Sequence, residues 1–219
     1  MVGKVTSDTV MSASRLPALF GVSKYSTPND ELRKSIAAMD GIERENVTNE
    51  AMGWGNVLEP LILREAVVRL GLDPSQADLD WTEAQRHPEW PFQCSLDGTI
   101  EGDGRQVVSD KGRGIYVIGS DSIFLEGRGI LEAKLTRVWP ETSPAIYRGP
   151  LQLQGQMAIM GATWGAVCVL YQGVELRVFL FEQDLRVQES IRDAVWEFDA
   201  KLSRYYQTGE IDLYQEATK

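Results

Sequence analysis

Apolar residues recur with the spacing of an α-helix in four segments of the chain. This spacing predicts helices over residues 28–39, 49–70, 150–161 and 184–207. The last helix is strongly amphipathic, with Leu185, Ile191 and Phe198 among the residues of its apolar face. Pro60 interrupts the second helix, because proline lacks a backbone donor and disfavours helical geometry at the residue before it. We therefore expect a kink or a fresh helix start near Glu59.

Between the second and third helices the pattern changes to short apolar runs separated by glycine, which is typical of β-strands. The predicted strands cover residues 94–101, 105–109, 115–118, 122–125 and 129–136. Two later runs, 163–171 and 174–181, predict a hairpin that turns at Gln172 and Gly173. This order indicates an α/β (α+β) fold class with a central mixed sheet flanked by helices. A length of 219 residues suits a single domain over 1–219.

Composition and charge narrow the class of protein. Two cysteines are too few for a disulfide framework, and the single histidine, His87, argues against a histidine-rich zinc site or a Ser/His triad. The chain has no apolar run that could span a bilayer and no N-terminal signal region, so we expect a cytoplasmic protein without membrane contact. The net charge of −10 argues against broad nucleic-acid binding, but local charge distribution matters more than its sum.

Candidate chemistry lies in two of the predicted strands. Side chains alternate between the two faces of a strand, so segment 129–136 places Glu132 and Lys134 together on one face, opposite an apolar face. Asp97 lies in the predicted strand 94–101. If the two strands are neighbours, the carboxylates of Asp97 and Glu132 converge on one point.

Two carboxylates beside an amine suit the hydrolysis of a phosphodiester. Magnesium prefers oxygen ligands and usually takes one or two carboxylates together with waters and substrate phosphates. Lys134 would orient or help to deprotonate the attacking water, and we expect its pKa to fall in such a site. An E-x-K tripeptide is expected roughly once by chance in a chain of this length. The motifs around it therefore decide whether it indicates a nuclease site.

Five short motifs accompany these residues. In chain order they are 14–17 (SRLP), 55–60 (GNVLEP), 95–98 (SLDG), 131–134 (LEAK), and Tyr147 followed by 152–157 (QLQGQM). Each motif is weak by itself, but the five in this order are fairly specific. Over about residues 12–160 the chain resembles the phage lambda exonuclease and YqaJ-like viral recombinase group of the PD-(D/E)xK nuclease superfamily. This resemblance implies a restriction-endonuclease-like core.

The resemblance also implies an activity and its setting. The implied activity is a Mg²⁺-dependent exonuclease that degrades one strand of linear double-stranded DNA from 5′ to 3′ and leaves 3′ single-stranded overhangs. Each site would hold two ions, with Mn²⁺ as a substitute for Mg²⁺. The implied partners are a single-strand annealing protein and further copies of the chain in a ring-shaped homotrimer. Such proteins are phage- or prophage-encoded and act in the bacterial cytoplasm.

Individual roles follow from the same resemblance. Asp97 and Glu132 would be the principal metal ligands, joined by the backbone carbonyl of Ala133. Glu59 would reach a metal directly or through water, and Lys134 would handle the nucleophilic water.

Two further roles concern the glutamine-rich helix and the N-terminal region. Gln154 would contact the water or the phosphate near the site, although its neighbours Gln152 and Gln156 are alternatives. Arg15 would bind the 5′-phosphate of the DNA, with Ser26 or Thr27 assisting, because a guanidinium suits bidentate contact with phosphate.

One departure from the family pattern stands out. Asp97 and Glu132 are 35 positions apart, whereas the family usually joins these strands by a short turn. The excess, about 101–128, predicts an insertion of one or two β-hairpins with residues 110–114 at a tip. Two other readings remain: a PD-(D/E)xK endonuclease, and a non-catalytic DNA- or protein-binding module of the same fold. A Cas4-like nuclease is excluded, because two cysteines cannot hold its iron–sulfur cluster.

The cysteines and tryptophans are expected to have structural rather than catalytic roles. We expect Cys94 and Cys168 to be buried filler in strand-like surroundings. Trp54, Trp139 and Trp164 are expected in the core or at an interface rather than as platforms for stacked bases.

Overall fold

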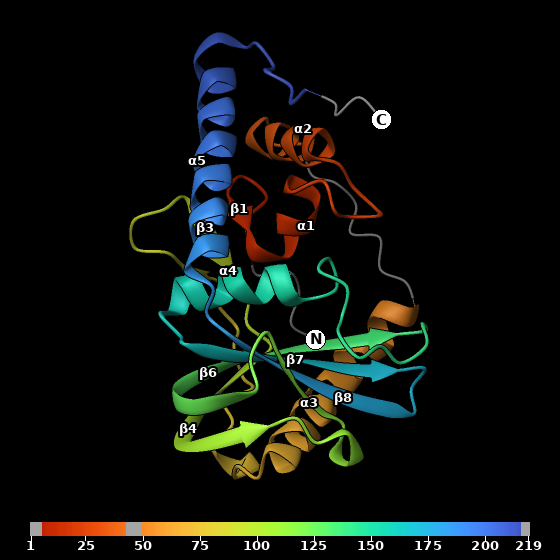
Figure 1. Ribbon diagram of the computed structural model, residues 1–219. Coiled ribbons are helices and arrows are strands. Elements are labelled where there is room, and N and C mark those ends of the chain that lie inside the picture. The colour runs from red at the N-terminus through yellow and green to blue at the C-terminus, as the bar shows by residue number, and fades with distance from the viewer. Residues whose placement is uncertain (1–5, 43–49, 216–219) are drawn as a thin grey trace.

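The computed structural model describes residues 6–42 and 50–215, and its centre is a five-stranded sheet (Figure 1). The strands of this sheet are β4 (Gly98–Val108), β5 (Ile115–Ile118), β6 (Ser122–Thr136), β7 (Trp164–Tyr171) and β8 (Glu175–Glu182). They lie in the order β4-β6-β7-β8-β5. Because β6 runs parallel to β7 and β5 to β8, while the other neighbours are antiparallel, the sheet is mixed.

A second, smaller sheet joins the N-terminal region to the segment that precedes β4. It contains β1 (Met11–Ser12), β2 (Gln85–Arg86) and β3 (Phe92–Cys94). The central strand β3 pairs in parallel with β1 and antiparallel with β2.

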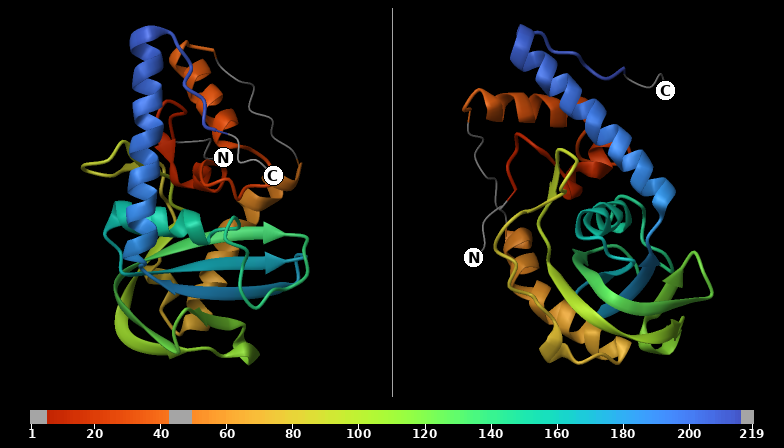
Figure 2. Two further views of the ribbon diagram at one scale, coloured as in Figure 1. Left: turned by 45° about the horizontal axis from the view of Figure 1, so that its top comes forward. Right: turned by 90° about the vertical axis from the view of Figure 1, so that its left-hand side faces the viewer.

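Helices cover both faces of the large sheet, as the right-hand view of Figure 2 shows. Helix α3 (Glu50–Leu70) packs on one face, and α4 (Pro150–Met160) packs on the other. Beyond α4 lie α5 (Leu185–Thr208), α2 (Pro28–Met39) and the short α1 (Leu16–Leu19). The 3₁₀ turns are η1 (Ala13–Arg15), η2 (Pro74–Gln76) and η3 (Lys111–Arg113).

Two hydrophobic cores result from this layering. Consecutive residues of a strand face opposite layers, so Ile130 joins the core beneath α4 whereas Leu131 joins the core beneath α3. Both residues are fully buried. Strands buried on both faces need continuous apolar runs rather than alternation, which explains the sequence of β7.

Helix α3 continues through Pro60. Of the two outcomes expected near Glu59, the fresh helix start therefore does not occur. The C-terminal half of the helix is packed against the sheet, with Leu63 and Val67 fully buried.

The predicted strand over 94–101 is interrupted in the structure. Cys94 ends β3 in the small sheet, and β4 begins only at Gly98 in the large one. Residues 95–97 carry the chain from one sheet to the other. Asp97 therefore lies immediately before β4, and the segment that crosses between the two sheets determines its position.

The stretch 101–128 belongs to the large sheet. β4 and β6 are long antiparallel partners whose pairing extends from Gly98↔Leu131 to Val108↔Ser122. A register shift between Asp103 and Gln106 marks a bulge, where Gly104 takes a positive φ of 80°. The linking residues contain η3 and β5, which crosses to pair with β8. The two core strands are thus lengthened, and no separate hairpin is added beside them.

The predicted fold class is confirmed, with a mixed sheet between helical layers. Both Cys94 and Cys168 are free and buried. Among the residues that the structure describes, no helix combines the length and apolar character needed to cross a membrane.

The contact between Gly129 and Trp164 provides a test of this packing. A β-carbon at Gly129 would overlap the indole ring of Trp164, which is fully buried. We expect Gly129→Ala to lower the free energy of unfolding by about 1–3 kcal/mol, as overpacking does in other cores. Urea denaturation measures the change. Gly53→Ala is the control, because a β-carbon there meets nothing within 4 Å and should leave stability unchanged or raised.

Candidate active site

The site begins where β4 meets β6. Gly98, the first residue of β4, pairs with Leu131, so Asp97 enters the sheet beside Glu132. The Oδ2 atom of Asp97 accepts a hydrogen bond from the backbone N–H of Ala133 at 2.8 Å. This bond fixes the Asp97 carboxylate against β6, between Glu132 and Lys134. The structure thus brings together the two predicted acids across neighbouring strands.

Glu132 lies at the centre of the cluster and is 1% exposed. Its Oε1 accepts a hydrogen bond from the ammonium of Lys134, and its Oε2 accepts one from Nε2 of Gln156 at 2.6 Å. The ammonium also lies 3.3 Å from Oε1 of Gln152. The Lys134 side chain is 29% exposed, so the cluster has an opening to solvent on the side of the amine.

The acids are close enough to change one another's ionisation. Burial, followed by the charge of Glu132, raises the pKa of Asp97 well above its ordinary value. The same two causes, in the same order, raise the pKa of Glu59. Burial acts to lower the pKa of Lys134, but the charges of Glu132 and Asp97 outweigh it, so this pKa is raised. The expected fall in the Lys134 pKa concerns the site with a bound metal and stays a prediction.

The donor set fits a hard divalent cation. The carboxylates of Asp97 and Glu132 offer the oxygen ligands that such a cation prefers, and the Oε1 of Gln156 is buried without a hydrogen-bond partner. The raised pKa of Asp97 reports its burial and, second, repulsion by Glu132, and a bound cation would offset both. Within residues 6–42 and 50–215, no three acidic, histidine or cysteine side chains are arranged as a preformed metal site. Two carboxylates are sufficient for magnesium, which keeps several waters.

Gln154 lies away from this cluster. Its Nε2 donates to the carbonyl of Glu182 at 2.8 Å, and its Oε1 accepts from the backbone N–H of Asp184 at 2.9 Å. Gln154 thus ties α4 to the start of α5, and the structure does not place it in the predicted catalytic contact. Residues four apart share a helix face, so Gln152 and Gln156 point to the site and Gln154 does not. The four-residue spacing of Gln152 and Gln156 could have identified these two glutamines as the site residues from the sequence.

Arg15 is also placed differently from its predicted role. Its Nε donates to Glu31 Oε2 at 2.5 Å, and one amino group donates to the Glu31 carbonyl and to Ser35 Oγ. The other amino group donates to the carbonyls of Asp8 and Val10. All five N–H donors are used, and Arg15 is 6% exposed. No donor is left for a DNA 5′-phosphate in this conformation.

The two predicted assistants of Arg15 have local partners as well. Ser26 donates from its hydroxyl to Oε1 of Glu31 at 2.7 Å. Thr27 is the N-cap of α2 and forms a capping box with Asp30. Their hydroxyls thus hold the beginning of α2 in place.

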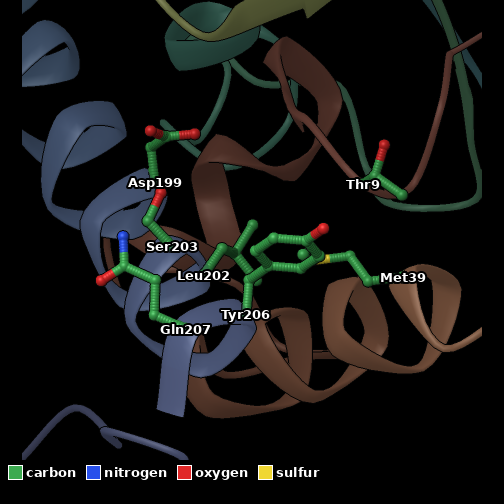
Figure 3. Close-up of a pocket in the computed structure, with 7 residues that line it drawn as sticks. All are labelled: Thr9, Met39, Asp199, Leu202, Ser203, Tyr206 and Gln207. Atoms are coloured by element: carbon green, nitrogen blue, oxygen red, sulfur yellow. The ribbon is translucent and has the colours of Figure 1, made fainter. Parts of the chain in front are cut away.

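A pocket of about 340 Å³ lies between α2 and α5 (Figure 3). Its lining consists of Thr9, Met39, Asp199, Leu202, Ser203, Tyr206 and Gln207. Burial raises the pKa of Asp199, the one carboxyl in this lining. None of the predicted site residues contributes to this pocket.

The fold and the site together define the class: a restriction-endonuclease-like core with one acid directly before β4 and a second acid and a lysine on the neighbouring strand β6. The model of the YqaJ-like viral recombinase domain matches residues 6–163, and the chain therefore belongs to the YqaJ-like viral recombinase family. Comparison with curated proteins gives no match.

Solved structures share this fold at low identity. The alkaline exonuclease LHK-Exo from Laribacter hongkongensis is 19% identical, with a TM-score of 0.64 over 92% of this chain and 91% of that one. Its complex with dAMP is likewise 19% identical and gives 0.62 over 91% and 90%. A phage-related exonuclease from Haemophilus somnus 129PT is 12% identical and gives 0.59 over 92% and 96%.

The burial of Asp97 beside Glu132 yields a stability prediction. Because the pKa of Asp97 is raised on folding, the native state loses stability as the pH rises from the ordinary pKa of an aspartate through that raised value. Asparagine keeps an oxygen that accepts from Ala133 but removes the charge. We expect Asp97→Asn to raise the Tm of the metal-free protein at pH 8. The rise should be about 2–4 °C for each kcal/mol that the buried charge of Asp97 costs the folded state.

Calorimetry at two pH values provides the measurement for Asp97→Asn. The Tm difference should vanish near pH 3, where the carboxyl is protonated in both folded and unfolded protein. Asp121→Asn, at an exposed position, controls for the general loss of one negative charge. A variant with a lower Tm at pH 8 would contradict the inferred cost of a charge on Asp97.

The buried pairing of Arg15 leads to a second prediction. Arg15→Ala leaves the Glu31 carboxylate without its cationic partner, although the Glu31 side chain is only 10% exposed. We expect a loss of about 3–5 kcal/mol in the free energy of unfolding, measured with urea. Arg192→Ala, which breaks an exposed pair with Asp193, should change stability by less than about 0.5 kcal/mol. Unchanged stability together with a lost preference for 5′-phosphorylated DNA would instead restore the phosphate-binding role.

Proposed function

We propose that this protein is a Mg²⁺-dependent exonuclease that digests one strand of linear double-stranded DNA from its 5′ end. Digestion leaves 3′ single-stranded overhangs, the substrate for recombination by annealing. The observation that carries the proposal is the cluster of Asp97, directly before β4, with Glu132 and Lys134 of the paired strand β6 in a YqaJ-like domain. The exonuclease names of solved proteins with the same fold support it.

In this proposal Asp97 and Glu132 are the principal ligands of the cation. The carbonyl of Ala133 and the Glu59 carboxylate complete a two-ion site for Mg²⁺, with Mn²⁺ as a substitute. A bound cation supplies charge neutralisation at the phosphate oxygens and a lowered pKa for the attacking water. The hydrogen bond from Ala133 N–H holds the Asp97 carboxylate in its direction before substrate arrives.

Lys134 and the two glutamines position the water and the phosphate. Because its pKa is raised, Lys134 is protonated at neutral pH in the substrate-free protein. It therefore enters the reaction as a cation that offsets phosphate charge and directs the lone pairs of water. Gln152 limits the swing of the ammonium, and Gln156 holds the Glu132 carboxylate in its rotamer.

The proposal extends to assembly and setting. The outward face of α3 carries Trp54, Val57, Leu61 and Val68, which are 50–61% exposed. A helix that is apolar on both faces is normally covered on both, and this supports self-association into the proposed homotrimeric ring. Basic residues need only line the channel of such a ring, so the acidic net charge is not an obstacle. A single-strand annealing protein, in the cytoplasm of a phage-infected bacterium, is the proposed partner.

The activity test uses three substrates and one set of variants. Purified protein is incubated with Mg²⁺ and linear duplex DNA carrying or lacking a 5′-phosphate, labelled at either end, alongside closed circular DNA. We expect strand loss from the 5′ end of phosphorylated linear DNA, survival of the circles, and arrest by EDTA. Glu132→Gln and Lys134→Ala should each lower the rate by about 100-fold or more.

The matched control is Glu126→Gln, because Glu126 is an exposed acid on the same strand β6. It should digest DNA at the wild-type rate. Undiminished digestion by Glu132→Gln would reject the site, and cleavage of circles would favour an endonuclease. Inactivity on every substrate would favour a non-catalytic binding module.

A further inference from the structure

A second pocket, of about 530 Å³, lies at the C-terminal end of α3 and contains none of the candidate active-site residues. Three segments meet there: the last turn of α3, the turn η3, and the turn between β7 and β8. Residues 110–114, which include η3, belong to the stretch that departs from the family pattern. The proposed function gives neither this turn nor the pocket a role.

Cations dominate the lining of this pocket. Arg69, Lys111 and Arg113 line it together with a single acid, Glu175. That acid already forms an ion pair with Arg177 of β8. Neither Lys111 nor Arg113 has an ion-pair partner within residues 6–42 and 50–215. The whole chain has 22 basic and 32 acidic residues, so the excess of positive charge is a local property of this pocket.

Hydrogen bonds hold two of the cations in place and leave them with unused donors. Arg69 donates from Nε to Glu65 at 2.9 Å, and from one amino group to the carbonyls of Leu176 at 2.7 Å and Arg113 at 3.3 Å. Arg113 in turn donates from one amino group to the carbonyl of Arg69. The second amino group of each guanidinium has no acceptor in the part of the chain that the structure describes. Both groups are therefore preorganised to bind a ligand.

The turn η3 is held against the sheet by its own backbone contacts. Asp110 is its N-cap, and its carboxylate accepts a hydrogen bond from the backbone N–H of Arg113 at 3.2 Å. Gly114 takes a positive φ of 71°, and a β-carbon there would come within 2.7 Å of the Leu176 carbonyl. Glycine thus lets the turn pack closely on β8, which fixes the position from which Lys111 extends.

We infer that this pocket binds a phosphate group, supplied by the DNA backbone or by a free nucleotide. Guanidinium groups suit bidentate contact with phosphate oxygens, and an ammonium adds a compact charge. The two cations without acidic partners match the charge of a phosphate monoester, which is about −1.5 to −2 at pH 7. A carboxylate carries a single charge and fewer oxygens, so it would leave donors of this cluster unused.

The pocket is separate from the candidate active site. Arg69 follows Glu59 by ten positions on α3, which corresponds to about 15 Å along the helix axis. Because a duplex rises about 3.4 Å for each base pair, this distance equals about four base pairs. A backbone phosphate in the pocket would therefore hold a duplex at a second point, away from the reacting phosphate. Only this DNA source of the phosphate rests on the proposed function.

Nuclear magnetic resonance of the isotope-labelled full-length chain locates the bound anion. The protein in EDTA is titrated at constant ionic strength with inorganic phosphate, with dTMP and with acetate in separate experiments. We expect phosphate and dTMP to shift the amide signals of Gly112 and Gly114, because both glycines line the pocket. Acetate should shift them much less. An equal response to acetate would overturn the inference and favour a carboxylate of a protein partner.

Lys111→Gln tests the cluster without touching the contacts between Arg69 and Arg113. We expect this variant to raise the Kd for phosphate by about threefold to tenfold, and Lys111→Arg to stay within about twofold of the wild type. Arg186→Gln is the matched control, because it removes an exposed cation at the other end of β8, on the first turn of α5. The control should keep the wild-type Kd. A wild-type Kd for Lys111→Gln would reject the pocket.

A short blunt duplex in EDTA separates the two sources of phosphate. Fluorescence anisotropy gives its binding constant over a range of salt concentrations. If the DNA backbone occupies the pocket, Lys111→Gln should reduce the slope of log K against log salt by about 0.9, the value for one lost phosphate contact. Arg186→Gln should leave the slope unchanged. An unchanged slope for Lys111→Gln, together with weakened binding of dTMP, would identify a free nucleotide as the source.

The outcomes also distinguish this inference from the proposed function. If the protein digests DNA while phosphate leaves the signals of Gly112 and Gly114 unmoved, only the phosphate pocket is rejected. If the protein binds phosphate through Lys111 but digests no substrate, only the nuclease is rejected.

Discussion

The hydrogen bond from the Ala133 backbone N–H to the Asp97 carboxylate is the interaction on which the candidate site depends. It joins the last residue of the crossing between the two sheets to the middle of β6. The register of β4 against β6, beginning at Gly98↔Leu131, makes this bond sterically available. The same register places Glu132 beside Asp97, so the pairing of β4 with β6 determines the geometry of the site. Both hydrophobic cores stabilise the site because they hold β6 between α3 and α4.

This arrangement has an electrostatic cost. Asp97 and Glu59 have raised pKa values because they are buried near Glu132, and Lys134 offsets only part of the accumulated charge. A protein selected for stability alone would replace these acids, since buried carboxylates stabilise a fold poorly. Shifted pKa values of this kind are common at functional sites, where a bound ligand or ion offsets the charge. Gln156 adds to the same pattern, because its Oε1 is buried without a partner.

Much of the fold and the centre of the site could be predicted from short-range rules. Strand alternation placed Glu132 and Lys134 on one face, and the helical periods located α2, α3 and α5 to within a few residues. Other features depend on contacts between distant segments. The pairing of Arg15 with Glu31 is one of these, because no local pattern states that all the donors of a guanidinium are satisfied by the protein itself. The exposure of Trp139 is another, since apolar character by itself predicts burial.

Anomalous diffraction from crystals grown with Mn²⁺ tests the central claim most directly, because it locates the ion without any assumption about activity. The proposed function predicts a peak bound to oxygens of both Asp97 and Glu132 at about 2.1–2.2 Å, with Lys134 displaced from Glu132 toward the substrate side. A peak only at other carboxylates, or none while the ion pair between Lys134 and Glu132 remains intact at millimolar Mn²⁺, would contradict it.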